Sequence, residues 1–280
     1  MTTGSIPKEK KMNDQKELTD FFNTNKKAWN NKTPFHLKSE LYDLEGFKKG
    51  KSSLKFIELE ELGDVNNKTM LHLQCHFGQD SLSWARMRAK VTGVDFSDEA
   101  IKVARSLNDE LNLDAKFIWS NIYDIEEHLD EKFDIVFSSY GTIGWLPELK
   151  EWGRLISNYL KPGGIFYIVE FHTVLWMFDD DFKKFKYSYF NRGEIEEEVE
   201  GTYADMNAPL KQKQYGWNHP LSEVINSLIE NSLQIEFLHE FPFSVYDVFS
   251  NSVKGKDGWW RIKGMEDIIP MMFSIKAKKH

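Results

Sequence analysis

The chain has 280 residues, of which 41% are hydrophobic and 14% aromatic, enough to bury one large core. Its 44 acidic and 36 basic side chains give a net charge of -8, which argues against a broad nucleic-acid interface and favours a small or neutral partner. A single cysteine, Cys75, excludes an intramolecular disulfide, and neither a signal-peptide pattern nor a membrane-spanning apolar run is present. We therefore expect one cytoplasmic domain with additions, spanning residues 1–280.

The first 60 residues are expected to form a leader and a cap. Residues 1–12 are charged and have no hydrophobic period, which is typical of a solvated leader. Residues 15–29 carry apolar side chains at helical spacing, including Phe22 and Trp29. This pattern predicts an amphipathic helix that docks on the rest of the domain as a cap.

Residues 61–171 alternate between short apolar runs and helical patterns. The runs are almost continuously apolar, as strands covered on both faces must be. They lie at residues 70–73, 91–94, 116–119, 133–137 and 165–169. A helical pattern over residues 101–111 follows Ser97, a suitable N-cap residue. The alternation predicts an α/β fold with a doubly wound parallel sheet.

The alternation stops after Phe171, and residues 172–219 are expected to be an insertion with a hairpin of its own, formed by residues 199–203 and 212–217. Residues 220–280 then show a helical pattern and two further strand-like runs, which complete a mostly parallel sheet of seven strands. Because the insertion leaves the carboxyl end of the fifth strand, we expect it to close over the site as a lid together with the N-terminal helix.

Residues 74–80 connect the first strand to a helix, an arrangement that directs backbone N–H groups at a ligand. A dinucleotide-binding turn needs three glycines here and only Gly78 is present, which disfavours a nicotinamide or flavin cofactor. The second strand ends at Asp95, 21 residues after Gln74. An acid at this place can accept both hydroxyl protons of a ribose.

These residues carry a resemblance to a known family. Residues 70–171 resemble the class I S-adenosylmethionine-dependent methyltransferase core in order and spacing: the first turn, Asp95, Asn121 after the third strand, and the Leu-Lys-Pro-Gly-Gly run at 160–164 before the fifth. The turn Leu-Gln-Cys-His-Phe-Gly at 73–78 also resembles that of a subgroup of bacterial small-molecule methyltransferases. The resemblance implies the Rossmann-like methyltransferase fold and S-adenosylmethionine as cofactor.

The resemblance also implies a role for each matching position. The first turn would bind the methionine part of the cofactor, and the end of the second strand would bind its ribose. The end of the third strand would lie near the adenine, and the end of the fourth strand would add backbone contacts. The cofactor-binding candidates are Gln74, His76, Gly78, Asp95, Phe96, Asn121, Ile122 and Ser138. This chain departs from the family at His72, where an acid is usual, and at Gln74 and His76, where glycines are usual, so side chains occupy space where bare backbone normally approaches the ligand.

Candidates for catalysis and acceptor binding come from the segments around this site. Glu170 and His172, at the end of the fifth strand, are the expected bases if the acceptor must lose a proton. The expected substrate-binding residues are Trp29, Tyr140, Trp145 and His219, although ordinary core packing explains the aromatic residues equally well. We expect Cys75 to be structural, and no metal site, because no known ligand spacing occurs.

Three functions remain open. The favoured one is methyl transfer from S-adenosylmethionine to a small molecule, which the sequence does not identify. The altered first turn would also suit a regulatory protein that binds the cofactor without turnover. A methyltransferase acting on RNA or protein is disfavoured by the acidic balance, and it would present a basic surface beside the cofactor cleft.

Overall fold

Seven strands form one sheet in the order β3-β2-β1-β4-β5-β11-β8 in this computed structural model, which describes residues 15–280. Its strands are β1 Thr69–Leu73, β2 Lys90–Asp95, β3 Lys116–Trp119, β4 Phe133–Ser139, β5 Leu160–Phe171, β8 Leu233–Phe241 and β11 Met272–Lys279. The first five pair in parallel, whereas β11 runs antiparallel to both β5 and β8. The predicted doubly wound, mostly parallel seven-stranded sheet is confirmed; the expected leader lies outside the described residues.

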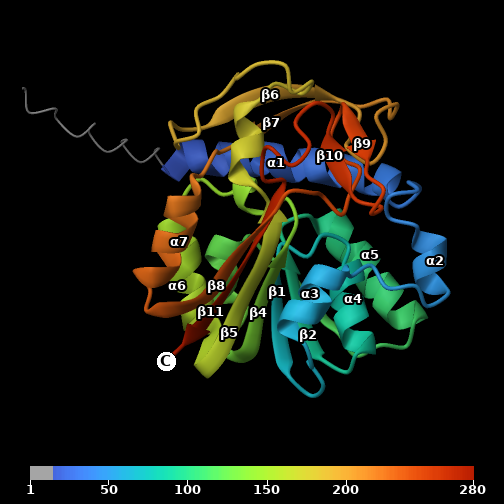
Figure 1. Cartoon of the computed structure of the whole chain (residues 1–280). Helices are drawn as coiled ribbons and strands as arrows, with labels where there is room; N and C mark the ends of the chain where they lie inside the picture. The colour runs from blue at the N-terminus through green and yellow to red at the C-terminus, as the bar shows by residue number, and fades with distance from the viewer. Residues whose placement is uncertain (1–14) are drawn as a thin grey trace, which may run out of the picture.

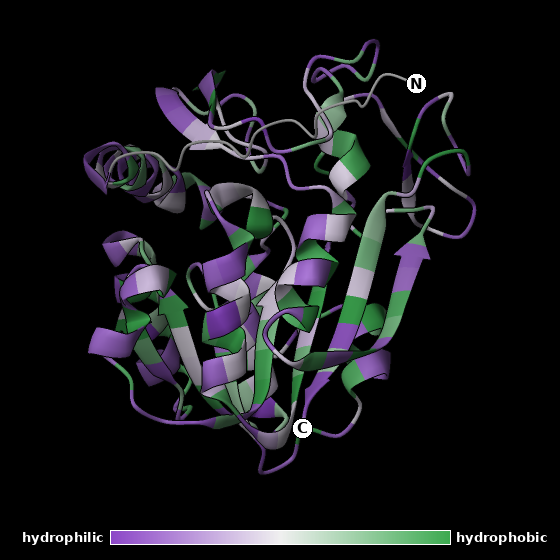
Figure 2. Cartoon of the chain, turned by 90° about the vertical axis from the view of Figure 1, so that its left-hand side faces the viewer, coloured by the Kyte–Doolittle hydropathy of each residue, from purple (hydrophilic) through white to green (hydrophobic). Residues whose placement is uncertain are grey.

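The sheet is buried on both faces, which explains why its strands read as continuous apolar runs. Alternate residues of a strand supply two different cores: Phe137 and Tyr167 face one, and Val136 and Phe166 face the other. All four side chains are fully buried. Figure 2 shows the central strands as predominantly hydrophobic, between helices whose outer surfaces are hydrophilic.

Helices cover both faces and fix the sheet between them (Figure 1). One face is covered by α3 Phe56–Leu62, α4 Gln79–Arg86 and α5 Asp98–Glu110, and the other by the 3-10 helix η1 Ile122–Glu127 with α6 Leu149–Tyr159 and α7 Leu221–Ile229. Ser97 caps α5 as predicted, because its hydroxyl accepts the Ala100 N–H at 3.1 Å. Connections between strands therefore return to the same edge, where the carboxyl ends of β1, β2, β4 and β5 gather.

A cover lies across this edge. Helix α1, Gln15–His36, runs over the strand ends, and a hairpin of β6 Ile195–Glu200 and β7 Lys211–Gly216 lies beyond it (Figure 1). Asn25 joins the two, since its side-chain amide donates to the Tyr215 carbonyl and accepts the Tyr215 N–H, both at 2.8 Å. The remaining elements are α2 Leu44–Lys48, two 3-10 turns η2 Ile143–Trp145 and η3 Thr173–Met177, and a ribbon of β9 Ser252–Lys254 and β10 Trp260–Ile262.

The cover differs in detail from the prediction. Helix α1 continues for seven residues past Trp29, and the first hairpin strand begins at Ile195 instead of residue 199. The strand cannot extend to residue 203, because Gly201 has a φ of 67° and the chain turns there. Exposed and half-buried residues alternate along β6, so only one of its faces is exposed.

Candidate functional site

The turn after β1 has an unusual backbone. Gln74, His76 and Gly78 have φ values of 55°, 50° and 81°, the left-handed region that favours glycine. At Gly78 no side chain fits, because a Cβ would lie 2.7 Å from the Phe117 ring. Gln74 and His76 keep the backbone of a glycine turn although they carry side chains, and strain of this kind concentrates at functional sites.

Asp95 ties this turn to the end of β2. Its carboxylate accepts the backbone N–H of His76 and that of Ser97, each at 2.8 Å. The residue is only 6% exposed, and burial raises the pKa of its carboxyl group to about 6. Each carboxylate oxygen has lone-pair capacity beyond these two bonds, so a diol could still bind there.

Four buried polar atoms without a hydrogen-bond partner converge on the same turn. They are Trp29 Nε1, His36 Nε2, Gln74 Oε1 and His76 Nδ1. His36 and His76 contact each other, with His36 Nδ1 at 2.9 Å from His76 Nε2, and the Gln74 amide donates to the Thr142 carbonyl at 2.9 Å. Buried polar atoms in folded proteins are almost always paired, so this group suits a polar ligand at the end of β1.

Lys32 and His36 are candidate site residues that the sequence analysis missed. Both side chains are buried on the inner side of α1, and burial lowers the pKa of His36 to about 3 and that of Lys32 to about 8. They follow Trp29 at spacings of three and seven residues, which places them on its helix face. That spacing was the available signal, but polar neighbours and Pro34 ended the visible apolar pattern at Trp29.

The remaining cofactor candidates lie along the same edge with different exposures. Phe96 accepts the Trp119 indole N–H at 2.9 Å through its carbonyl, and the Asn121 side chain caps η1 by accepting the Tyr123 N–H at 3.2 Å. Ile122 is in the core, and the fully buried Ser138 hydroxyl contacts Thr142.

Glu170 has a different role from the one expected. Its carboxylate accepts the backbone N–H groups of Gly141, Thr142, Ile143 and Phe171, and the Thr142 hydroxyl at 2.9 Å. The side chain is buried, and burial raises the pKa of this carboxyl group. Because its lone pairs are occupied by donors that fix the loop after β4, these contacts support a structural role and give no support to a general base.

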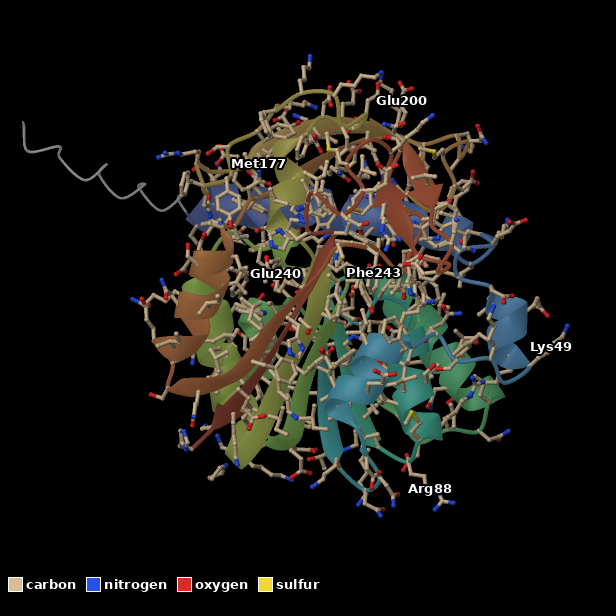
Figure 3. The ribbon with its side chains drawn as sticks, in the orientation of Figure 1. Lys49, Arg88, Met177, Glu200, Glu240 and Phe243 are labelled. Carbon is tan, nitrogen blue, oxygen red and sulfur yellow. The ribbon has the colours of Figure 1, made fainter. Side chains whose placement is uncertain are left out.

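The two expected site histidines are also engaged elsewhere. His172 Nε2 lies 2.8 Å from the Glu240 carboxylate, and its Nδ1 accepts the Val174 N–H at 3.2 Å. Figure 3 labels Glu240 toward the upper end of β8, so His172 faces the outer strands of the sheet. His219 is buried, and its Nε2 lies 2.7 Å from the carbonyl oxygen of Leu146. This contact fixes the loop that carries Trp145.

The three aromatic candidates divide between two places. Trp29 and Trp145 meet edge to face with ring centroids 5.3 Å apart, at the contact between α1 and the loop after β4. The Tyr140 hydroxyl instead donates to Glu58 at 2.8 Å, toward α3, and burial raises the pKa of Glu58 to about 7. The structure thus brings the two tryptophans together with His76, whereas Tyr140 points toward α3.

Comparisons with known proteins agree with this geometry. The sequence profile of a family described as a methyltransferase domain matches residues 64–219, more than half of the chain. A ubiquinone biosynthesis O-methyltransferase of Serratia proteamaculans is 26% identical over 145 residues, which cover 50% of this chain and 60% of that protein. Among residues 15–280, no helix has the length and apolar character needed to cross a membrane.

Solved structures share the fold. A protein of Listeria monocytogenes classed as an S-adenosylmethionine-dependent methyltransferase has a TM-score of 0.58 at 21% identity, over 80% of this chain and 96% of that one. An S-adenosylmethionine-dependent methyltransferase of Mesorhizobium loti has a TM-score of 0.54 at 15% identity, over 83% of this chain and 100% of that one. At sequence identities this low, the two similarities show only that this chain shares their fold.

Proposed function

Because this chain belongs to the class I S-adenosylmethionine-dependent methyltransferase family, we propose that it transfers the cofactor's methyl group to a small molecule. The observation that carries the proposal is the edge formed by Asp95 and the turn at residues 74–78. A buried carboxylate with remaining acceptor capacity and a group of unpartnered polar atoms lie there side by side, at the point where the strand order reverses.

The residues present fit S-adenosylmethionine. Asp95 would accept the ribose hydroxyl protons, while Gln74 Oε1 and His76 Nδ1 would bind the polar amino-acid end. When bound, the cofactor supplies a methyl group already activated by its sulfonium. The protein then needs to align the acceptor and exclude water, and α1 with the hairpin of β6 and β7 covers the edge where this must occur.

A small acceptor is supported by the cover and by the charge. The outer surface of the hairpin carries glutamates, such as Glu200, which is labelled at the top right of Figure 3, and the whole chain has a net charge of -8. Both features disfavour RNA. The Serratia relative is by name an enzyme of ubiquinone biosynthesis, which also favours a small molecule. Cys75 is buried and unpaired, in keeping with a cytoplasmic location.

If the acceptor must lose a proton, the contacts favour the pair of His36 and His76 over Glu170 and His172. The pair shares one proton between His36 Nδ1 and His76 Nε2. Either tautomer leaves one free N–H and one bare nitrogen among the two outer atoms, both of which are buried and unpartnered. The bare nitrogen has a free lone pair, unlike the occupied atoms of Glu170 and His172, but burial lowers the pKa of both histidines, so the pair is a weak base.

The test separates binding from turnover. We expect S-adenosylhomocysteine to bind the purified protein in calorimetry, and S-adenosylmethionine to be converted to S-adenosylhomocysteine when small-molecule fractions of a cell extract are added. RNA and protein fractions should give no conversion. Failure to bind S-adenosylhomocysteine would refute the proposal, and binding without conversion in any fraction would favour a regulatory protein.

A further inference from the structure

Lys32 is a buried ammonium group in the cover. The residue is only 3% exposed, and its Nζ donates to the side-chain oxygen of Gln214 on β7 at 2.8 Å. The same Nζ lies 4.9 Å from the ring centroid of Trp29 and 5.2 Å from that of Trp145. Its surroundings are therefore one neutral amide and two indole faces, between α1 and the loop after β4, and its charge also lowers the pKa of the neighbouring imidazoles of His36 and His76.

This environment lacks a counter-ion in the described part of the chain. The carboxylate of Glu197 on β6 raises the pKa of Lys32 but is not within ion-pair distance of it. Glu197 instead accepts the Tyr187 hydroxyl and lies 3.6 Å from Lys186 Nζ. Buried lysines are rare unless they are paired, because desolvation of a lone charge is costly. Burial lowers the pKa of Lys32 only to about 8, so the group is still mostly charged at pH 7.

We propose that Lys32 binds the carboxylate of a small molecule held between α1 and the loop after β4. An anion at this place would complete the hydrogen bonding of the ammonium and neutralise its charge in a site closed to water. The flanking indoles of Trp29 and Trp145 would pack against the carbon skeleton that carries the carboxylate. This inference rests on the proposed function and names the chemistry of a ligand of that same site.

A carboxylate of this kind has two sources in a methyltransferase: the amino-acid end of the cofactor, or the methyl acceptor. Two matched pairs of ligands distinguish them. S-adenosylhomocysteine against its decarboxylated form reports on the cofactor, and benzoate against benzamide, with the protein free and saturated with S-adenosylhomocysteine, reports on the acceptor. Calorimetry gives the ratio of the two dissociation constants for each pair.

The variants are chosen so that a structural role of Lys32 gives a different result. Lys32→Met removes the charge at nearly constant volume, and Lys27→Met is the control, because Lys27 is exposed on the same helix. Gln214→Met removes the hydrogen-bond partner of Lys32 but leaves its charge. If Lys32 serves only to hold β7 through its hydrogen bond to Gln214, Lys32→Met and Gln214→Met should have the same effect on ligand binding, and both should lower the melting temperature.

The wild type should prefer the carboxylate member of one ligand pair by about tenfold to a hundredfold, the range of a charge-assisted hydrogen bond. Lys32→Met should abolish that preference without lowering the melting temperature of the free protein, because an unpaired buried charge has been removed. Lys27→Met and Gln214→Met should keep the preference. The affected pair identifies the source of the carboxylate.

The proposal is overturned if Lys32→Met changes neither ratio, or if Gln214→Met reproduces its loss. A wild type that binds no S-adenosylhomocysteine would instead refute the proposed function. In that case the benzoate and benzamide ratio on the free protein still decides the role of Lys32.

Discussion

The ionisation of Asp95 should control cofactor affinity near pH 6. Burial raises the pKa of this carboxyl group from its usual 3.8 to about 6, so holding it as an anion costs about 3 kcal/mol, at 1.36 kcal/mol per unit. Only the ionised carboxylate keeps acceptor capacity on both oxygens for the two ribose hydroxyls, because protonation turns one oxygen into a donor, so binding should favour the anion. Affinity for S-adenosylhomocysteine should therefore be constant above pH 7 and fall about tenfold for each pH unit below 6.

Ionisation of Asp95 has the opposite effect on folding stability: it favours cofactor binding but lowers the stability of the folded state. A raised folded-state pKa contributes stability that is fully present below 3.8 and is lost as the pH rises through about 6. Loss of affinity at pH 5 therefore cannot be attributed to unfolding through Asp95. The neighbouring pair does not titrate in this window either, because burial lowers the pKa of His36 to about 3 and holds that of His76 well below its usual range.

Calorimetric titration of S-adenosylhomocysteine from pH 5 to pH 8 measures this dependence. Asp95→Asn should weaken binding at pH 7.5 by about tenfold to a hundredfold and should give a flat pH profile. Asp114→Asn is the matched control, since Asp114 is exposed on the connection that leads into β3, and it should keep the wild-type profile. A flat profile in the wild type, or an unchanged profile in Asp95→Asn, would refute the assignment of Asp95 to the ribose.

Three further substitutions test the scaffold of the site. Glu170→Gln places an amide among N–H donors and should lower the free energy of unfolding by about 1–3 kcal/mol in urea titration; unchanged stability with lost turnover would restore Glu170 as a base. Gly78→Ala should cost about 1–3 kcal/mol in the same assay, because the added Cβ meets the Phe117 ring, and a stable variant would contradict the left-handed turn. Asn25→Ala orphans the backbone groups of Tyr215, so hydrogen exchange in α1 should accelerate and S-adenosylhomocysteine should bind more weakly; unaltered exchange would mean that this contact does not hold the cover.

The location of the candidate cofactor edge could be predicted from the sequence, because it depends on the order of strands and helices along the chain. Parallel strands joined by helices all end at one edge, so Asp95 and the turn at residues 74–78 had to meet there once both strands were recognised. The hydrogen bond from the His76 N–H to Asp95 forms because the two strand ends lie side by side. The direction of individual side chains at the same edge does not follow from the order of the strands.

Glu170 and His172 show this limit. Both stand at the end of the fifth strand as predicted, Glu170 inside it and His172 just after it, yet one side chain turns into the loop after β4 and the other toward Glu240 on β8. Their partners are distant in sequence, and β8 joins the sheet only through β11, so no local pattern could indicate these contacts.

The sequence by itself determined the fold class, the succession of strands and helices in the core and the place of Asp95 at the end of the second strand, because hydrophobic periodicity acts over short stretches of chain. Only the tertiary structure decided which polar groups are buried without partners. Lys32 is an ordinary helix residue in sequence, and it becomes a desolvated charge only when β7 and Trp145 pack around it from residues more than a hundred positions away. Desolvation depends on everything that surrounds a group in space, and that is set by packing.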